Sequence, residues 1–291
     1  MSELNLTDNK FIQFHQKIGF KFDGIKYYGY KGDTIASALL RNNLKLIGRS
    51  FKYHRPRGFY TCGIEEPNAL VQIISEYSEP NTRATIKKIY EGMEIESQNR
   101  WPSLETDIGS INNIFSPVFP AGFYYKTFMG PHKNFWKKIY EPIIRKAAGL
   151  GKPPKEFKAV STHLHHNVDI TIVGGGLNGL IAAKSLIDTK YSVLLIDFDD
   201  QLGGILNNSN KVLSVNNQTP MDWISETVKE IENSKNIKIL KNTLVTTYNY
   251  INHLIAVEDK FVGSRPLKDK VNSTLHKIRT DQVILSNGHI E

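Results

Sequence analysis

Three glycines in the second half of the chain carry the clearest chemical signal. Gly174, Gly176 and Gly179 form the pattern G-x-G-x-x-G, directly after the apolar run VDITIV and at the start of a helical pattern. In this pattern the first glycine permits a tight turn, the second lets a pyrophosphate approach the backbone, and the third lets helix and strand pack closely. Free N–H groups at the helix N-terminus also attract phosphate. The spacing therefore predicts a dinucleotide-binding turn.

Other residues extend this candidate site. Asp197 ends the next predicted strand, YSVLLID, where a carboxylate can accept hydrogen bonds from the adenosine ribose, which favours NAD or FAD over NADP. The following QLGG offers a second close backbone approach, and VILSNGHIE resembles a degenerate form of the ATG strand that closes the nucleotide site in two-dinucleotide-fold flavoproteins. An empty Rossmann-like domain with a glycine turn is the alternative. The predicted cofactor-binding residues are Gly174, Gly175, Gly176, Asn178, Gly179, Asp197, Phe198, Gly203, Gly204, Ser286, Asn287 and Gly288.

Strand and helix patterns alternate around this site, from residue 167 to residue 291. The segment TPMDWISETVKEIENS predicts a helix with Thr219 as its cap and Pro220 at its first position. The segments NIKIL, TLVTTYNY, HLIAVED and DQVILSNG predict strands. The alternation indicates an α/β, Rossmann-like domain with a parallel, doubly wound sheet.

A different pattern occupies residues 10–98. IGFKFDGIKYYGY predicts two strands around the turn Asp23-Gly24, and GDTIASALLRNNL predicts a helix that Asp33 or Thr34 caps, with Ile35, Ala38 and Leu39 on its apolar face. A long loop, GRSFKYHRPRGFYTCGIEEPNAL, leads to the predicted strand ALVQIIS. A hairpin, a helix, a loop and a strand in this order are typical of the β-grasp fold of plant-type ferredoxins.

This ferredoxin-like domain lacks the expected metal ligands. A plant-type [2Fe–2S] site needs C-x4-C-x2-C and a distant fourth cysteine. Cys62 is the single cysteine of the chain, and the matching positions hold Pro67 and Leu70, which cannot bind iron. The sequence predicts a scaffold with no [2Fe–2S] cluster, which acts by packing or by binding a partner, and no metal site.

Residues 99–166 form a predicted connector that is rich in aromatic and basic residues. It contains one predicted helix, around Asn134 to Ala148, which Pro142 should kink or break. His163, His165 and His166 lie at its end, where a polar linker segment is a more economical interpretation than a metal site.

Charge and hydropathy exclude several classes of protein. The chain has 291 residues and a formal net charge of +8, but no run of five or six like charges of the kind that binds nucleic acid. The N-terminus does not have the pattern of a signal peptide, and no apolar run is long enough to span a membrane. The sequence therefore predicts a cytoplasmic protein with neither nucleic acid nor membrane as a partner.

Several long segments resemble one known family. The chain is similar to the α subunit of heterotetrameric sarcosine oxidase, from about Phe20 to Glu291, through GDTIASALLRNN, GRSFKYHRPRG, EEPNALV, AGFYYKTFM, YEPIIRKAAGLG and NTLVTTYNYINHLIAVED. Opine and amine dehydrogenase α subunits share the layout but usually keep the cluster cysteines, so EEPNALV favours the sarcosine oxidase branch.

The resemblance implies more than the residues show. It implies NAD at the glycine motif, with FAD as the alternative, and partner β, γ and δ subunits. In the family, sarcosine is oxidised at FAD in the β subunit, and FMN at the α–β interface passes electrons to oxygen, so no catalytic residue is expected in this chain. The products are glycine, hydrogen peroxide and formaldehyde, or methylene-tetrahydrofolate.

The family's α subunit is much longer than this chain, which ends at SNGHIE within the nucleotide domain. The resemblance therefore implies an N-terminal fragment or an incomplete gene model, with a truncated Rossmann-like domain. The alternatives are an opine or amine dehydrogenase α subunit, and a non-catalytic dinucleotide-binding module that organises partner subunits.

Overall fold

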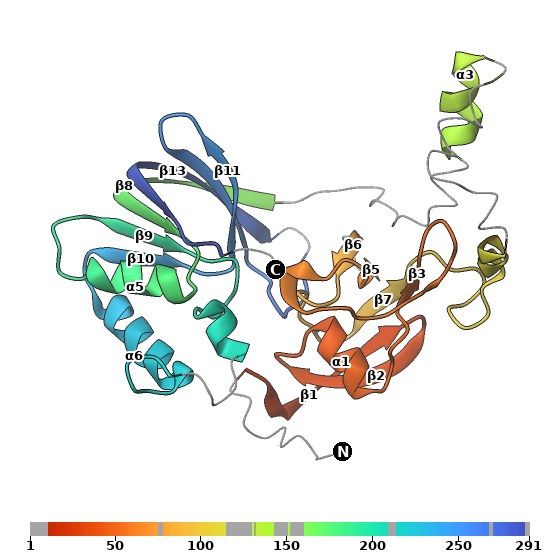
Figure 1. Ribbon diagram of the computed structural model, residues 1–291, viewed down its shortest axis with the longest axis horizontal. Helices are drawn as coiled ribbons and strands as arrows, with labels where there is room; N and C mark the ends of the chain where they lie inside the picture. The colour runs from red at the N-terminus through yellow and green to blue at the C-terminus, as the bar shows by residue number, and fades with distance from the viewer. Residues whose placement is uncertain are drawn as a thin grey trace. The chain divides into compact units, whose positions relative to one another are not determined.

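The computed structural model comprises two compact units (Figure 1). The first consists of Met1–Phe157 with Gly263–Pro266, and the second of Lys158–Val262 with Leu267–Glu291. The structure describes residues 11–74, 78–114, 130, 132–142, 151, 160–208, 214–267 and 270–288.

The first unit is built on a five-stranded sheet in the order β2-β1-β7-β5-β6. Strand β1 is parallel to β7, and the other neighbouring pairs are antiparallel. The helix α1 (Ile35–Arg41) follows the first hairpin. This topology is the predicted ferredoxin-like β-grasp fold. The strands are β1 (Gln13–Phe22), β2 (Ile25–Lys31), β5 (Leu70–Ile74), β6 (Glu79–Arg83) and β7 (Met93–Ser97).

Local sequence signals account for the first hairpin and helix. Asp23 and Gly24 both have positive φ, 49° and 82°, as a tight turn between antiparallel strands requires. Thr34 caps α1 by accepting a hydrogen bond from the Ser37 N–H at 3.1 Å. The helix ends at Asn42, and Asn43 follows with a φ of 60°.

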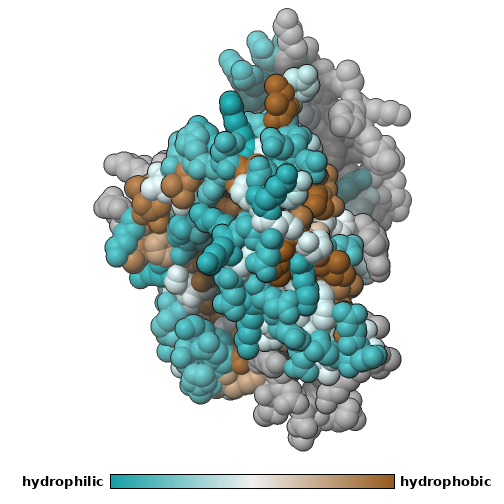
Figure 2. All heavy atoms as spheres, turned by 90° about the vertical axis from the view of Figure 1, so that its left-hand side faces the viewer, coloured by the Kyte–Doolittle hydropathy of each residue, from teal (hydrophilic) through white to brown (hydrophobic). Residues whose placement is uncertain are grey.

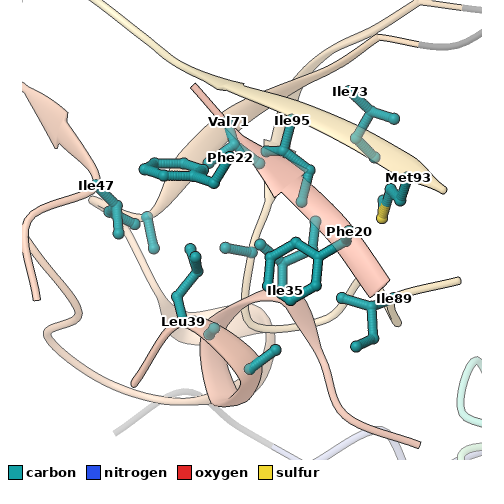
Figure 3. Packing of buried hydrophobic residues seen from close by; sticks show 14 of the residues in the cluster. Phe20, Phe22, Ile35, Leu39, Ile47, Val71, Ile73, Ile89, Met93 and Ile95 are labelled. Atoms are coloured by element: carbon teal, nitrogen blue, oxygen red, sulfur yellow. The ribbon is translucent and has the colours of Figure 1, made fainter. Parts of the chain in front are cut away.

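The core of this unit lies between α1 and the sheet (Figure 3). Phe20 and Phe22 are two residues apart in β1, so both point to the same face of the sheet, where they pack against Ile35 and Leu39 of α1. Full burial of each such side chain contributes about 1.5–3 kcal/mol. Met93 of β7 packs in the same cluster.

Hydrogen bonds connect the basic loop after α1 to the segment that follows β7. Its strands β3 (Gly48–Arg49) and β4 (Pro56–Arg57) pair with each other, and a 3-10 turn, η3 (Ile108–Asn113), lies further along the chain. The Arg49 guanidinium donates to the Leu104 carbonyl at 2.9 Å, and His54 Nδ1 lies 2.6 Å from Asp107 Oδ2. Asp107 is buried, and its Oδ2 also lies 4.0 Å from Arg49 Nε, so part of the positive charge in GRSFKYHRPRG stabilises the loop itself.

The connector's predicted helix is present as far as the structure describes it. Helix α3 (Lys133–Phe135) continues into a π-helical turn, η5 (Trp136–Tyr140), and helical residues extend to Pro142. Proline has no N–H and its ring crowds the carbonyl of the residue four positions earlier, which agrees with the widened turn just before Pro142. The remainder of the predicted helix, 143–148, and the segment AGFYYKTFM lie outside the described residues.

The second unit is a six-stranded mixed sheet in the order β10-β9-β8-β13-β12-β11. The strands β10, β9, β8 and β13 are parallel, whereas β12 and β11 are antiparallel to their neighbours. The prediction of a parallel sheet is therefore wrong for β11 and β12, which form a meander with β13. The strands are β8 (Val160–Val173), β9 (Val193–Ile196), β10 (Ile237–Leu240), β11 (Thr243–Asn249), β12 (His253–Asp259) and β13 (Val271–Leu285).

The sheet of the second unit is not doubly wound within the described residues. Helices α5 (Leu177–Ser185) and α6 (Pro220–Asn233) share one hydrophobic cluster and lie on the same side of the sheet (Figure 1). On the opposite face, Leu194 of β9 packs with Leu254 of β12 and Ile278 of β13. Apolar side chains of the meander therefore cover the face where a doubly wound fold would place helices.

The histidines that were assigned to a linker lie in a strand instead. His163, His165 and His166 belong to β8 and pair in register with β13. His166 Nε2 lies 2.8 Å from Nδ1 of His276, which is itself buried. The pairing with β13 is a long-range contact that the local pattern STHLHH could not reveal. Among the described residues, no group of three or more His, Cys, Asp or Glu side chains could hold a metal ion.

Figure 2 shows a face on which hydrophilic residues predominate, with hydrophobic residues in separate small patches. None of the helices that the structure describes is both long and apolar enough to cross a bilayer.

Candidate dinucleotide-binding site

The predicted site residues gather at one edge of the second sheet. The parallel strands β8, β9 and β13 all end there, at Val173, Ile196 and Leu285. The Gly174 N–H donates to the Ile196 carbonyl at 2.8 Å, and the Ser286 N–H donates to the Val173 carbonyl at 2.7 Å. The carboxyl edge of parallel strands is where open α/β sheets bind their ligands.

Two of the three motif glycines are required by close packing. Gly174 has a φ of 103°, and a Cβ there would lie 2.4 Å from the Ser286 carbonyl oxygen. A Cβ on Gly179 would lie 1.8 Å from the Gly174 carbonyl oxygen. Contacts this short do not occur, so a side chain at Gly174 would displace the turn from Ser286, and one at Gly179 would displace helix α5 from the turn.

Gly176 differs from the other two because it faces open space. Its φ is −71°, and a Cβ built on it would meet no heavy atom within 4 Å. It is the N-cap of α5, and no side chain caps this helix end. The first hydrogen bond of the helix runs from the Leu180 N–H to the Gly176 carbonyl at 2.9 Å. The N–H groups of residues 177–179 therefore have no acceptor four residues earlier within the helix. We call this open space at the uncapped N-terminus of α5 the cradle.

The QLGG segment forms a second wall of this cradle. Gly203 has a φ of 121°, and its N–H donates to the Gly175 carbonyl at 2.8 Å. Gly204, with a φ of 53°, starts the 3-10 turn η6 (Gly204–Asn208), and a Cβ on it would lie 3.2 Å from the Gly176 Cα. A short stretch of backbone thus packs directly against the glycine turn.

Asp197 is held by the turn that it follows. Its Oδ2 accepts a hydrogen bond from the Gly175 N–H, and its Oδ1 accepts one from the Asp199 N–H at 2.8 Å. Burial raises the pKa of this carboxyl above its ordinary value, although both hydrogen bonds act in the opposite direction. The residue is 9% exposed, and each carboxylate oxygen has one acceptor position beyond these hydrogen bonds.

The other predicted residues lie at the rim. Asn178, on the first turn of α5, is exposed, and Phe198 is 42% exposed directly after Asp197. Asn287 and Gly288 are exposed where the chain leaves β13. The structure therefore brings the turn, Asp197, QLGG and Ser286 into direct contact, and leaves these four residues on the surface of the same edge.

Comparisons with known proteins agree with the two units. A family model described as a 2Fe-2S iron-sulfur cluster binding domain matches residues 15–100, and one described as an NAD(P)-binding Rossmann-like domain matches residues 172–239. The crystal structure of L-proline dehydrogenase from P. horikoshii superposes with a TM-score of 0.57, at 19% identity, over 95% of this chain and 41% of that chain. These matches define a class of chains in which a ferredoxin-like domain accompanies a Rossmann-like domain.

Sequence relatives are more specific than the fold. The chain is 43% identical over 249 residues to the sarcosine oxidase subunit alpha of Rhizobium meliloti (strain 1021), covering 84% of this chain and 24% of the relative. It is 26% identical to the subunit of the same name from Corynebacterium sp. (strain P-1), covering 91% of this chain and 23% of the relative. The chain thus spans about a quarter of the length of these relatives. The predicted resemblance to the sarcosine oxidase alpha subunit is confirmed.

The residues present do not fit the iron–sulfur cluster that the first family model implies. The chain has a single cysteine, Cys62, which is exposed, and a cluster of this type needs four thiolates.

The same loop contains a buried acidic residue that the sequence pattern did not single out. Glu66 is buried and accepts hydrogen bonds from backbone N–H groups of the loop. An acidic residue between turn-forming neighbours in GIEEPNAL is a weak signal, because Glu65 and Glu66 are indistinguishable without the fold.

Proposed function

We propose that the turn Gly174–Gly179 binds NAD, with Asp197 on the adenosine ribose. The observation that carries this proposal is the open space at Gly176 beside the uncapped N-terminus of α5. Backbone N–H groups at such a helix end donate to phosphate oxygens, and the helix dipole favours their negative charge. Gly203 and Gly204 would bring a second stretch of backbone to the pyrophosphate, and Ser286, Asn287 and Gly288 would line the opposite side.

We also propose that the chain works as part of an α subunit of a heterotetrameric sarcosine oxidase, with β, γ and δ partners. The support is its 43% identity to a relative named as such a subunit. In this proposal FAD and FMN belong to the complete complex and supply the redox chemistry, and sarcosine is oxidised in a partner subunit. The products would be glycine, hydrogen peroxide and formaldehyde or methylene-tetrahydrofolate. The residues of this chain bind and orient a dinucleotide.

The proposed domain division follows the sequence patterns. A ferredoxin-like domain would comprise residues 10–98, a connector residues 99–166, and the dinucleotide-binding domain residues 167–291. Strand β8 begins at Val160, so the last part of the connector would contribute to the second sheet.

The test uses the complex purified with its partner subunits. Sarcosine should bleach the flavin absorbance under anaerobic conditions, and air should restore it with release of hydrogen peroxide. Bleaching by another secondary amine but not by sarcosine would instead support an amine dehydrogenase subunit. A complex that binds a dinucleotide but is reduced by no amine would instead support the non-catalytic module that organises partner subunits.

A further inference from the structure

One loop of the ferredoxin-like unit is organised around a buried carboxylate. The Glu66 side chain is fully buried, between the 3-10 turn η2 (Gly63–Glu65) and strand β5. Its Oε2 accepts hydrogen bonds from the N–H groups of Tyr60 and Thr61, both at 2.7 Å. Its Oε1 accepts from Asn68 N–H at 2.7 Å and Ala69 N–H at 3.2 Å.

These hydrogen bonds satisfy the carboxylate without a cation. An ionised carboxyl has about four acceptor positions, and the four backbone N–H groups fill them. No ion pair of Glu66 occurs among the salt bridges of the described residues. Burial alone would raise the pKa of Glu66, but the N–H groups of residues 60, 61, 68 and 69 together lower it below its ordinary value. The buried side chain is therefore an anion that peptide dipoles hold.

The loop itself is fixed to the sheet, so these amides are held in place. The Thr85 hydroxyl donates to the Gly63 carbonyl at 2.6 Å, and the Ala84 N–H donates to the Ala69 carbonyl at 2.8 Å. Arg57 donates to the Asn68 side chain at 3.1 Å. The Gly63 and Ala69 carbonyls are thus bound outside the loop, while the N–H groups of residues 60, 61, 68 and 69 point onto Glu66.

In the sequence, this anion lies within the stretch that would carry the metal ligands. Cys62, Pro67 and Leu70 stand where C-x4-C-x2-C would place thiolates, and Glu66 lies between them in the chain. Concave arrangements of backbone N–H groups bind anions, and many Fe–S clusters sit in such arrangements. We propose that the Glu66 carboxylate replaces an iron–sulfur cluster as the anion that organises this loop, so that the domain folds without iron.

Metal analysis of the unmodified full chain gives the first test. Protein produced in iron-replete cells should contain neither iron nor acid-labile sulfide in stoichiometric amounts. Amide hydrogen exchange of residues 58–70 should be the same before and after treatment with an iron chelator. Stoichiometric iron and sulfide, or exchange that accelerates when iron is removed, would overturn the proposal.

Substitution of the carboxylate gives the second test. Glu66→Gln removes the charge and turns an NH2 group toward backbone donors, so amide exchange at Tyr60, Thr61, Asn68 and Ala69 should accelerate at least about tenfold. Glu65→Gln is the matched control, because Glu65 is an exposed neighbour and loses the same charge. If Glu66→Gln does not fold, Glu66→Asp keeps the charge but shortens the reach and should show the same acceleration. Unchanged exchange in Glu66→Gln or Glu66→Asp would refute the assigned role.

Discussion

The motif glycines provide a sharp prediction because the same substitution should lower NAD affinity at both Gly176 and Gly179 but should lower stability only at Gly179. In Gly176→Ala the new methyl group meets no heavy atom within 4 Å, and the φ of −71° suits alanine. Alanine stabilises the fold because it lowers the entropy of the unfolded chain, but it destabilises the helix because it is a poorer N-cap than glycine. These effects oppose each other, so the free energy of unfolding should change by less than about 1 kcal/mol. The same methyl group occupies the cradle proposed for the pyrophosphate.

The expected loss of affinity follows from the lost phosphate contacts. Preventing one charge-assisted hydrogen bond costs about 1.5–3 kcal/mol, which corresponds to a Kd for NAD that is roughly 10–150-fold higher. In Gly179→Ala, by contrast, the methyl group would lie 1.8 Å from the Gly174 carbonyl oxygen, so α5 must move away from the turn. Overpacking of this kind costs about 1–3 kcal/mol or more, so this variant should lose both stability and affinity.

Urea unfolding and calorimetric titration with NAD measure the two quantities separately. Gly48→Ala is a suitable control, because its Cβ would have only ordinary contacts, the nearest at 3.7 Å, and it lies outside the turn. Unchanged NAD affinity in a folded Gly176→Ala variant would refute the proposed cradle. Wild-type stability in Gly179→Ala would show that the packing between turn and helix is looser than the structure indicates.

Other substitutions test the remaining parts of the account. Asp197→Ala should weaken NAD binding by about 1–3 kcal/mol in calorimetry, through loss of charged hydrogen bonds, and unchanged affinity would remove it from the site. The pKa of Glu66 is lowered from 4.5, so its stabilising effect is fully present above that pH and is lost as the pH falls through the folded-state pKa. The difference in urea stability between wild type and Glu66→Gln should therefore shrink in acid, and a difference that grows in acid would contradict this sign. Thr219→Ala removes the 3.2 Å bond to the Asp222 N–H and should cost about 1 kcal/mol of helix stability, whereas an unchanged unfolding midpoint would show that the cap is dispensable. Phe20→Ala should cost about 3–5 kcal/mol in the ferredoxin-like core, and a loss below about 1 kcal/mol would mean that the core collapses around the cavity.

Features with a local chemical cause were predictable from the sequence. The turn at Asp23-Gly24 needs two positive φ angles, and the start of α6 needs a cap at Thr219 and a proline that tolerates the first helical position. The glycine turn was predictable because the motif spacing reports a contact within one strand-turn-helix unit, where Gly179 packs against the Gly174 carbonyl oxygen. The close approach of Gly174 to Ser286 is a long-range contact that the motif does not encode. The order of such local signals along the chain indicated a ferredoxin-like unit followed by a Rossmann-like unit.

Features that depend on distant segments could not be read in this way. The strand β8 includes STHLHH because β13, more than a hundred residues later, pairs with it. The direction of β11 and β12 depends on the meander that they form with β13, and their apolar patterns suit either direction. The role of Glu66 depends on amides on both sides of it in a folded loop, and no spacing rule distinguishes it from Glu65.

The central claim is that this chain holds a dinucleotide at the turn around Gly176. Mass spectrometry of the small molecules released when the purified protein is denatured tests it most directly. The account predicts NAD, with loss of that signal in the Gly176→Ala variant and its retention in Gly48→Ala. Release of FAD from the chain alone would contradict the choice of NAD and place the redox centre here. An NAD signal that survives in Gly176→Ala would contradict the site.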